Sequence, residues 1–260
     1  MDDILQFTAR DLELFLLVLM RIGTLFVTAP VFGSMGIPMQ LKAAFSLLLT
    51  ALLFPLINMQ TAVLPESMPG MAVLIGKEIS IGVAIGFAAT FVFQGLQLAG
   101  SLISTQMGIA MAEIIDPVTQ QEIPLIGQYL TLMGTIIFLV IDGHHLLLEA
   151  LLDSFRAVPL TMVNFSGAFF GQLLDMSRDI FIVGVKLGAP VFVSIFLLTI
   201  ILGVLQRVVP QMHIFSIGFP LKIISGFLLM AFFLDFFVYC FEKIFAQLHG
   251  DVELLIRYLS

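Results

Sequence analysis

The longest uncharged stretch of this chain covers residues 79–112, and a second one covers residues 123–141. A membrane-spanning helix needs about 20 mostly apolar residues, so both stretches are long enough to cross a bilayer. The polar segment 116–124, which begins with Asp-Pro and ends with Pro, separates them. The sequence therefore predicts two apolar helices joined by a polar loop, which is either an ordinary turn at the membrane edge or an element placed in a pathway.

The composition indicates a membrane protein. Hydrophobic residues make up 60% of the chain and charged residues 11%, whereas roughly a quarter of an average soluble domain is charged. With a mean hydropathy of +1.11, 260 residues cannot bury this much apolar surface in one water-facing domain. We therefore expect an integral membrane protein or a subunit of a membrane assembly.

Three further features narrow the class of protein. The acidic start Met1-Asp2-Asp3 lacks the positive region of a cleaved signal peptide, so we expect the first helix to stay attached. A single cysteine, Cys240, excludes an internal disulfide and a thiolate metal cluster. The net charge of −7 argues against a nucleic-acid-binding surface.

Apolar segments recur along the whole chain and are separated by breakers rich in proline and glycine. The segments cover residues 12–29, 43–57, 71–104, 123–141, 144–152, 180–205 and 214–241. They are too long and too continuously apolar for the alternating strands of a membrane barrel, so the predicted fold class is all-α. Pro55 and Pro190 lie inside apolar runs and are expected to kink or break their helices.

Several charged residues lie within or beside these apolar runs: Arg21, Lys77, Glu78, Lys186 and Lys222. A charge at the centre of a lipid-exposed helix costs about 2.5–3.5 kcal/mol. We therefore expect these helices to face protein partners or a wet cavity. The basic residues are spread evenly, so they predict no clear orientation in the membrane.

Small residues four apart allow helix backbones to approach closely. The chain has three such glycine pairs: Gly82/Gly86, Gly167/Gly171 and Gly184/Gly188. Each pair either marks a packing contact or reflects only the high frequency of glycine in membrane helices.

Motifs for chemistry are sparse. His145, Glu149 and Asp153 recur every four residues and would share one helical face. That spacing suits either a metal site or, as we favour, a polar stripe at a subunit interface. The sequence contains no HExxH motif, P-loop or Gly-x-Ser-x-Gly elbow, so we expect neither an enzyme nor a cofactor. A stand-alone transporter or permease stays open as an alternative, although the two halves of the chain lack the similarity usual in secondary transporters.

Residues 210–223 read Pro-Gln-Met-His-Ile-Phe-Ser-Ile-Gly-Phe-Pro-Leu-Lys-Ile and resemble the signature of the FliR family of flagellar export-gate subunits. Other stretches match in order: Arg21 to Pro30-Val31-Phe32-Gly33, Glu78 before Gly82 and Gly86, Gln106-Met107-Gly108 to Asp116-Pro117, and Asp142-Gly143-His144-His145 to Ser154-Phe155 and Pro159. The resemblance covers essentially the whole chain. His213 departs from it, because the family loop has asparagine there.

The resemblance implies a non-enzymatic part of a protein-conducting channel. One such subunit would join several copies of FliP and FliQ in a hetero-oligomeric ring of long, kinked helical hairpins. Residues 1–175 would be FliP-like, and residues 176–260 would form a FliQ-like hairpin. The location would be the bacterial inner membrane at the flagellar basal body. FlhB, FlhA and the exported unfolded proteins would be further partners.

The resemblance and the residue pattern together predict three groups of site residues. The mid-chain loop, about residues 106–122, would plug the pore through Met107, Gly108, Ile109, Met111, Glu113, Asp116, Pro117 and Glu122. A turn at residues 207–222 would dock FlhB through Arg207, Pro210, Gln211, His213, Phe215, Gly218, Phe219, Pro220 and Lys222. Packing and charge between subunits would involve Arg21, Lys77, Glu78, Gly82, Gly86 and Lys186.

The docking prediction rests on two physical arguments. Pro210 and Pro220 would bracket the turn, so neither neighbouring helix should run straight through it. Ile214, Phe215 and Phe219 are too apolar for a freely solvated turn. Either a partner covers these side chains, or they fold back onto their own hairpin.

Overall fold

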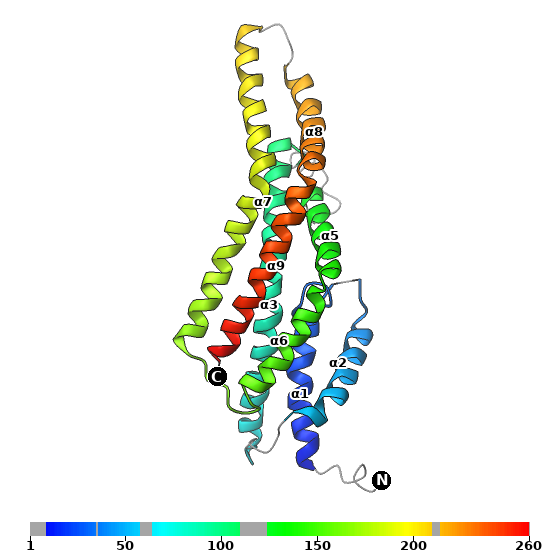
Figure 1. Cartoon of the computed structure of the whole chain (residues 1–260), viewed down its shortest axis with the longest axis vertical. Helices are drawn as coiled ribbons and strands as arrows, with labels where there is room; N and C mark the ends of the chain where they lie inside the picture. Colours follow the sequence, from blue (N-terminus) through cyan, green and yellow to red (C-terminus); the bar gives the residue numbers. More distant parts are fainter. Residues whose placement is uncertain (1–8, 35, 58–63, 110–123, 210–213, 260) are drawn as a thin grey trace. The chain divides into compact units, whose positions relative to one another are not determined.

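The computed structural model describes residues 9–34, 36–57, 64–109, 124–209 and 214–259. All regular structure in these ranges is helical (Figure 1). The helices are α1 (Ala9–Thr28), α2 (Met39–Leu53), the short 3-10 helix η2 (Phe54–Leu56), α3 (Met68–Met107), α5 (Leu125–Val140), α6 (Gly143–Ala157), α7 (Gly167–Val208), α8 (Ile214–Phe232) and α9 (Leu234–Arg257). The predicted all-α membrane fold is confirmed.

The prolines act differently from one helix to the next. Pro55 lies in η2, directly after α2 ends at Leu53, which confirms the predicted break. α7, in contrast, continues through Pro190. Proline removes one backbone N–H from a helix but leaves its own carbonyl as an acceptor. The Ser194 hydroxyl donates to that carbonyl at 2.6 Å, so the turn after Pro190 gains a side-chain hydrogen bond.

Within the described residues, three helical stretches are long and apolar enough to cross a membrane: Met39–Leu56, α3 and α7. The bent pairs α5–α6 and α8–α9 raise this number to five if each pair forms one span. The apolar run predicted at residues 214–241 is divided into α8 and α9 by a break at Phe233. α3 and α7 contain 40 and 42 residues. At 1.5 Å per residue each corresponds to about 60 Å of helix, roughly twice the thickness of a bilayer hydrocarbon core.

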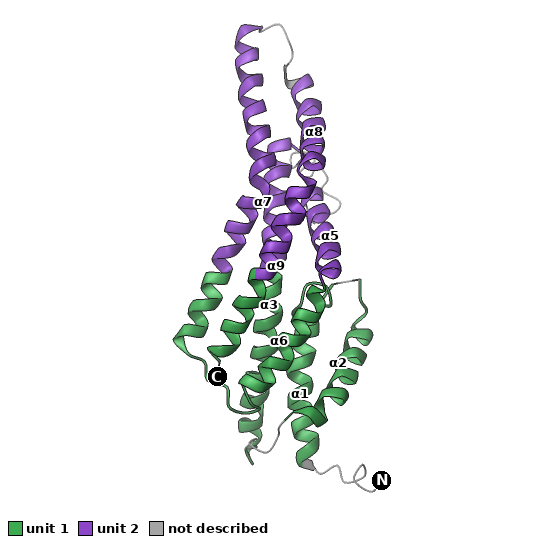
Figure 2. Ribbon diagram, in the orientation of Figure 1, with its two compact units in different colours: residues 1–90, 142–176, 247–260 green, residues 91–141, 177–246 purple. Residues whose placement is uncertain are grey.

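The chain forms two compact units, and each combines segments that are distant in sequence (Figure 2). Unit 1 contains residues 1–90, 142–176 and 247–260, and unit 2 contains residues 91–141 and 177–246. The predicted division into residues 1–175 and 176–260 follows family likeness rather than compactness, and it remains a prediction.

The core of unit 1 is built by α1, the first half of α3 and α6. Fully buried aliphatic side chains fill it, including Leu17, Ile22, Leu25, Ile81, Ile85, Leu147 and Leu151. α1 and α3 approach closely at Gly82 and Gly86, where a Cβ atom would collide with α1. At this crossing the Thr90 hydroxyl donates to the Thr28 carbonyl at 2.9 Å. The packing reading of the Gly82/Gly86 pair is therefore correct, and the packing is within the chain.

The core of unit 2 is aromatic. Phe93 lies with its ring centroid 5.9 Å from those of Phe138 and Phe245, and the latter two are 5.0 Å apart. Glycines bring the surrounding helices together, as at Gly184, where a Cβ atom would stand 2.7 Å from Leu98. Gly167 and Gly171, by contrast, face open space among the described residues, so that pair makes no packing contact within this part of the chain.

Candidate functional site

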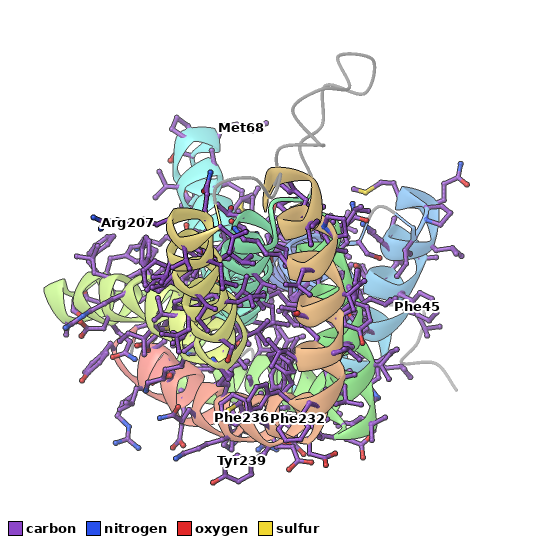
Figure 3. The ribbon with its side chains drawn as sticks, turned by 90° about the horizontal axis from the view of Figure 1, so that it is seen from above. Phe45, Met68, Arg207, Phe232, Phe236 and Tyr239 are labelled. Atoms are coloured by element: carbon purple, nitrogen blue, oxygen red, sulfur yellow. The ribbon has the colours of Figure 1, made fainter. Side chains whose placement is uncertain are left out.

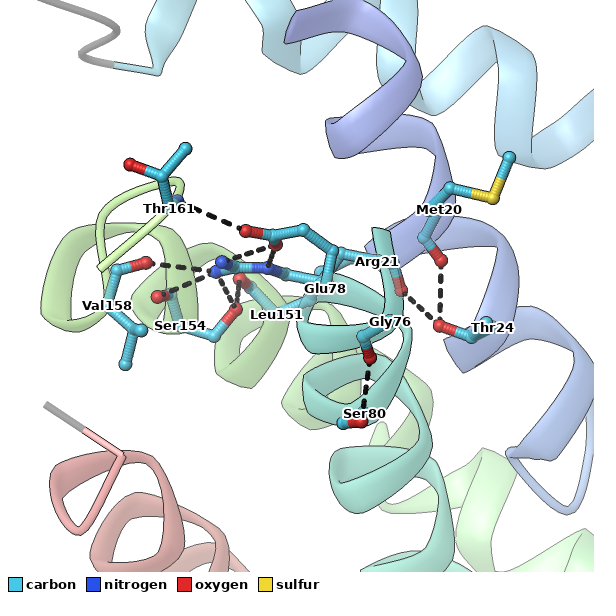
Figure 4. Close-up of polar contacts among 10 residues, drawn as sticks. All are labelled: Met20, Arg21, Thr24, Gly76, Glu78, Ser80, Leu151, Ser154, Val158 and Thr161. Carbon is cyan, nitrogen blue, oxygen red and sulfur yellow. Dashed lines mark hydrogen bonds and ion pairs between the residues drawn. The ribbon is translucent and has the colours of Figure 1, made fainter. Parts of the chain in front are cut away.

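Two residues that stood out as misplaced charges form a buried ion pair in unit 1 (Figure 4). Arg21 of α1 and Glu78 of α3 are both 0% exposed. The Arg21 Nε–H donates to Glu78 Oε2 at 2.6 Å, and Nη2 lies 2.6 Å from the same oxygen. The two side chains therefore neutralise each other inside the chain. The expectation that they face a partner subunit or a wet cavity is wrong.

The close approach of α1 and α3 explains the pairing. Gly82 lies one helical turn after Glu78, and it allows α1 to pack at the level of Arg21. An ion pair in a protein interior is maintained only if further hydrogen bonds compensate for the water that both charges lose. The Phe155 ring supplies one further contact, with its centroid 4.3 Å from the guanidinium carbon.

The remaining compensation comes from α6 and the connection that follows it. Arg21 Nη1 donates to the carbonyl oxygens of Ser154 at 3.0 Å and Val158 at 3.2 Å. The other Glu78 oxygen accepts from the Thr161 amide at 3.4 Å. Thr161 has a left-handed φ of 76°, a backbone conformation that side-chain-bearing residues rarely adopt. The ion pair thus holds the backbone of the α6–α7 connection in a specific shape.

Lys77, the third of these charges, acts on the same connection. Its ammonium group donates to the Val163 carbonyl at 3.2 Å. From the other side, the Ser166 hydroxyl donates to the Tyr258 carbonyl at 2.9 Å, and the Asn164 amide donates to the Leu259 carbonyl. α1, α3 and the end of the chain therefore all bind residues 158–166. Sequence reasoning missed this role because most of the partners are backbone groups, which no residue type reveals.

Lys186 and Lys222 differ from these buried groups. Lys186 is exposed on α7, and its predicted place at a subunit interface remains a prediction. Lys222 is half-buried in α8, where it borders a groove between α7 and α8.

The predicted plug begins at a well-defined helix end in unit 2. α3 ends at Met107, and Gly108 follows with a left-handed φ of 82°. The Gly108 amide donates to the Thr105 carbonyl and the Ile109 amide to the Ser104 carbonyl, both at 3.2 Å. This pair of hydrogen bonds is the Schellman motif, which ends helices at a left-handed glycine. The other predicted plug residues, namely Met111, Glu113, Asp116, Pro117 and Glu122, lie outside the described residues.

The turn predicted at residues 207–222 does not continue past residue 213, while the docking role of these residues remains a prediction. α8 begins at Ile214, so Phe215, Gly218, Phe219, Pro220 and Lys222 are all helical. Pro220 does not end the helix, because a proline costs a helix interior only about 3 kcal/mol and apolar packing of α8 can offset that amount. Arg207 lies in the last turn of α7, as a basic residue near a helix C-terminus should. Pro210, Gln211 and His213 lie outside the described residues.

Phe219 contacts another part of the chain, whereas the structure does not describe the surroundings of the Ile214 and Phe215 side chains. The Phe219 ring packs on the backbone of Gly108, where a Cβ atom would stand 2.6 Å from it. This aromatic side chain therefore folds back onto its own chain.

The polar residues predicted to share one face of a helix do so on α6, and that face is exposed. His145, Glu149 and Asp153 all face outward, and His145 Nδ1 lies 3.4 Å from Asp142 Oδ1. Asp153 also borders a groove of about 590 Å³ between α6 and α9, together with Arg156, His249, Glu253 and Arg257. Sequence reasoning missed this groove, because its two walls are about a hundred residues apart in the chain.

Comparison with known proteins identifies the family. Residues 12–248 match the model described as bacterial export proteins, family 1. The flagellar biosynthetic protein FliR of Bacillus subtilis (strain 168) is 33% identical over 246 residues, which are 94% of this chain and 92% of the relative. The FliR proteins of Pectobacterium carotovorum subsp. carotovorum and Escherichia coli (strain K12) are 31% and 29% identical, over 92% and 91% of this chain and 91% and 90% of the relatives. The chain belongs to family 1 of the bacterial export proteins.

Proposed function

We propose that this chain is a non-enzymatic, channel-forming subunit of a flagellar type III protein export gate. It assembles with FliP-like and FliQ-like chains in the bacterial inner membrane at the basal body, and exported proteins pass the gate unfolded. The family and its flagellar relatives support this role. The observation that supports assembly with other chains is the apolar surface of the long helices that this chain leaves exposed.

α7 presents most of this surface. In the most apolar 18-residue segment of α7, only 22% is buried within the chain. In Met39–Leu56, only 11% is buried. Large apolar side chains such as Phe181, Phe196 and Ile201 are exposed along α7. Figure 3 shows Phe45 of α2 and the α8–α9 residues Phe232 and Tyr239 pointing away from the ribbon. These faces need either lipid or another protein.

Helix length favours another protein for much of this surface. α7 corresponds to about 63 Å of helix, whereas a hydrocarbon core is about 30 Å thick. The exposed charges Asp175, Arg178, Asp179 and Lys186 lie in the same helix as the exposed apolar residues. Lipid tails cannot accommodate both along the whole length. Neighbouring helices of a multi-subunit ring can.

Co-expression tests this proposal. The chain should aggregate or be degraded when it is expressed alone, and it should co-purify when FliP and FliQ homologues are present. It should also restore secretion to a strain that lacks its own FliR. A folded, monodisperse monomer obtained without partners would instead favour the stand-alone permease.

Two finer roles complete the proposal. The loop at residues 106–122 closes the idle pore, and the α7–α8 hairpin end at residues 207–222 docks FlhB, with FlhA as a further neighbour. Deleting residues 110–122 should leave the assembly intact but make the membrane leak small ions, because the deletion spares the helix end at Gly108. If the deleted assembly forms and conducts no more than the wild type, the plug role is wrong.

A further inference from the structure

Two histidines and an aspartate meet at the start of α6, in unit 1. Asp142 precedes the helix, and His144 and His145 lie in its first turn. Each of these side chains offers one metal-binding atom, and the three atoms lie within 4.8 Å of one another. In the described part of the chain, no other group of three or more histidine, cysteine or acidic side chains comes together in this way.

The closest pair of donor atoms has the spacing that a tetrahedral ion requires. His145 Nδ1 lies 3.4 Å from Asp142 Oδ1. Zinc binds imidazole nitrogen and carboxylate oxygen at about 2.0–2.2 Å, so two of its tetrahedral ligand atoms stand about 3.3–3.5 Å apart. The rings of His144 and His145 lie side by side, with their centroids 4.2 Å apart and an angle of 35° between their planes. Small side-chain rotations can therefore direct all three donors at one ion.

The Asp142 carboxylate is not used to cap the helix. Asp142 occupies the N-cap position, where an aspartate side chain usually accepts a hydrogen bond from an amide of the first turn. Its side chain makes no such bond here. An N-cap residue usually has β-region backbone angles, whereas Asp142 has a left-handed φ of 57°. The carboxylate lies beside the His145 ring instead, where it is available to a ligand.

His144 gives a second, independent sign that a group from outside the chain completes this cluster. Its Nδ1 atom is buried and has no hydrogen-bond partner among the described residues. Native proteins leave few buried polar atoms without a partner, because each one loses its bonds to water without compensation. A metal ion bound by this imidazole would compensate for that loss.

We propose that Asp142, His144 and His145 bind a divalent transition-metal ion of the zinc class, through one carboxylate oxygen and one ring nitrogen of each histidine. Two nitrogens and one oxygen suit such an ion, whereas magnesium and calcium prefer oxygen ligands. A helix N-terminus disfavours a cation, and the Asp142 carboxylate offsets that effect. The Asp142 and His145 side chains are 70% and 64% exposed, so water can reach the fourth position of the ion.

This trio differs from the one that the sequence suggested. His145, Glu149 and Asp153 share one face of α6, but Asp153 lies eight residues after His145. That separation corresponds to about 12 Å of helix, which one ion with bonds of about 2 Å cannot bridge. The two trios therefore make opposite predictions for the removal of Asp142 and of Asp153.

Zinc titration of the purified complex tests the proposal. The chain would be co-expressed with its FliP-like and FliQ-like partners, purified through a tag without histidine, stripped of metal with a chelator and titrated calorimetrically with Zn²⁺. Asp142→Asn and His145→Ala should each weaken Zn²⁺ binding at this site by more than about 100-fold, because the loss of a residue that only orients a ligand already costs about 10–100-fold. Zinc sites on the partners would be the same in every variant, so only the difference from the wild type counts.

Two matched controls make the test specific. Asp153→Asn is the same acid-to-amide change two turns further along α6, and His249→Ala removes another exposed histidine of unit 1. Both variants should bind Zn²⁺ like the wild type. Co²⁺ supplies a second readout, since its visible absorption spectrum should change on binding to the wild-type complex and to both controls but not to Asp142→Asn.

The proposal is overturned if Asp142→Asn and His145→Ala take up as much Zn²⁺ as the wild type, or if the two controls lose as much binding as they do. If His145→Ala fails to assemble, Asp142→Asn decides the matter alone, because it keeps the shape of an exposed side chain. Secretion is not part of this measurement, so the metal site and the proposed function can fail separately.

Discussion

Replacing Glu78 by glutamine should weaken unit 1 strongly although the two side chains have nearly the same shape. Glutamine can still accept the Thr161 amide through its carbonyl oxygen, so that hydrogen bond is retained. The charge that compensates Arg21 is lost, however, and both residues are 0% exposed. Removing one partner of a buried ion pair costs about 3–5 kcal/mol, because the other charge remains buried and unpaired.

The expected change in melting temperature follows from this cost. One kcal/mol shifts the melting temperature of a 150–250-residue protein by about 2–4 °C, so Glu78→Gln should lower it by about 6–20 °C. The assay is thermal unfolding of the co-purified complex in detergent, read by loss of helical circular dichroism. Protease cleavage within the α6–α7 connection should also become faster, since Arg21 and Glu78 hold the backbone at Val158 and Thr161.

Asp153→Asn is the matched control, because it makes the same acid-to-amide change in an exposed pair. The Arg156 and Asp153 side chains are 81% and 58% exposed and lie 3.1 Å apart at the closest N–O distance. Exposed pairs of this kind contribute about 0–1 kcal/mol. Equal shifts in melting temperature for the two variants would refute the reasoning that burial makes the Glu78 charge essential.

Three further predictions concern other parts of the chain. Gly86→Val should destabilise the complex by about 1–3 kcal/mol because its side chain would collide with Thr28, whereas Gly171→Ala should be neutral or slightly stabilising in the same thermal assay. Phe138→Ala should cost about 3–5 kcal/mol by opening a cavity in the aromatic core, and the exposed Phe232 should tolerate alanine. Phe215→Asp should reduce cross-linking to FlhB and block secretion while the ring still assembles. If the variant still cross-links to FlhB and still secretes, the docking role is wrong.

The helices could be located from the sequence because their signals are local. Apolar runs separated by prolines and glycines predicted most of the helices within a few residues, and Pro55 ended α2 as expected. Pro220 shows the limit of this approach. The sequence carries a helix-breaking residue there, and the packing of α8 overrides it.

The partners of the charged residues depended on the tertiary structure. Arg21 and Glu78 are 57 residues apart, and the sequence marked both as out of place without indicating that they meet. Their further partners are backbone groups of Ser154, Val158 and Thr161, which every residue type offers equally. The contacts of Met107 with Gly226 and of Phe219 with Gly108 also arise only when α3 and α8 come together. The sequence determined which groups would be costly to remove from water, because that cost depends on residue type. The fold decided which groups compensate for it, because hydrogen bonds and close packing act over a few ångströms between segments far apart in the chain.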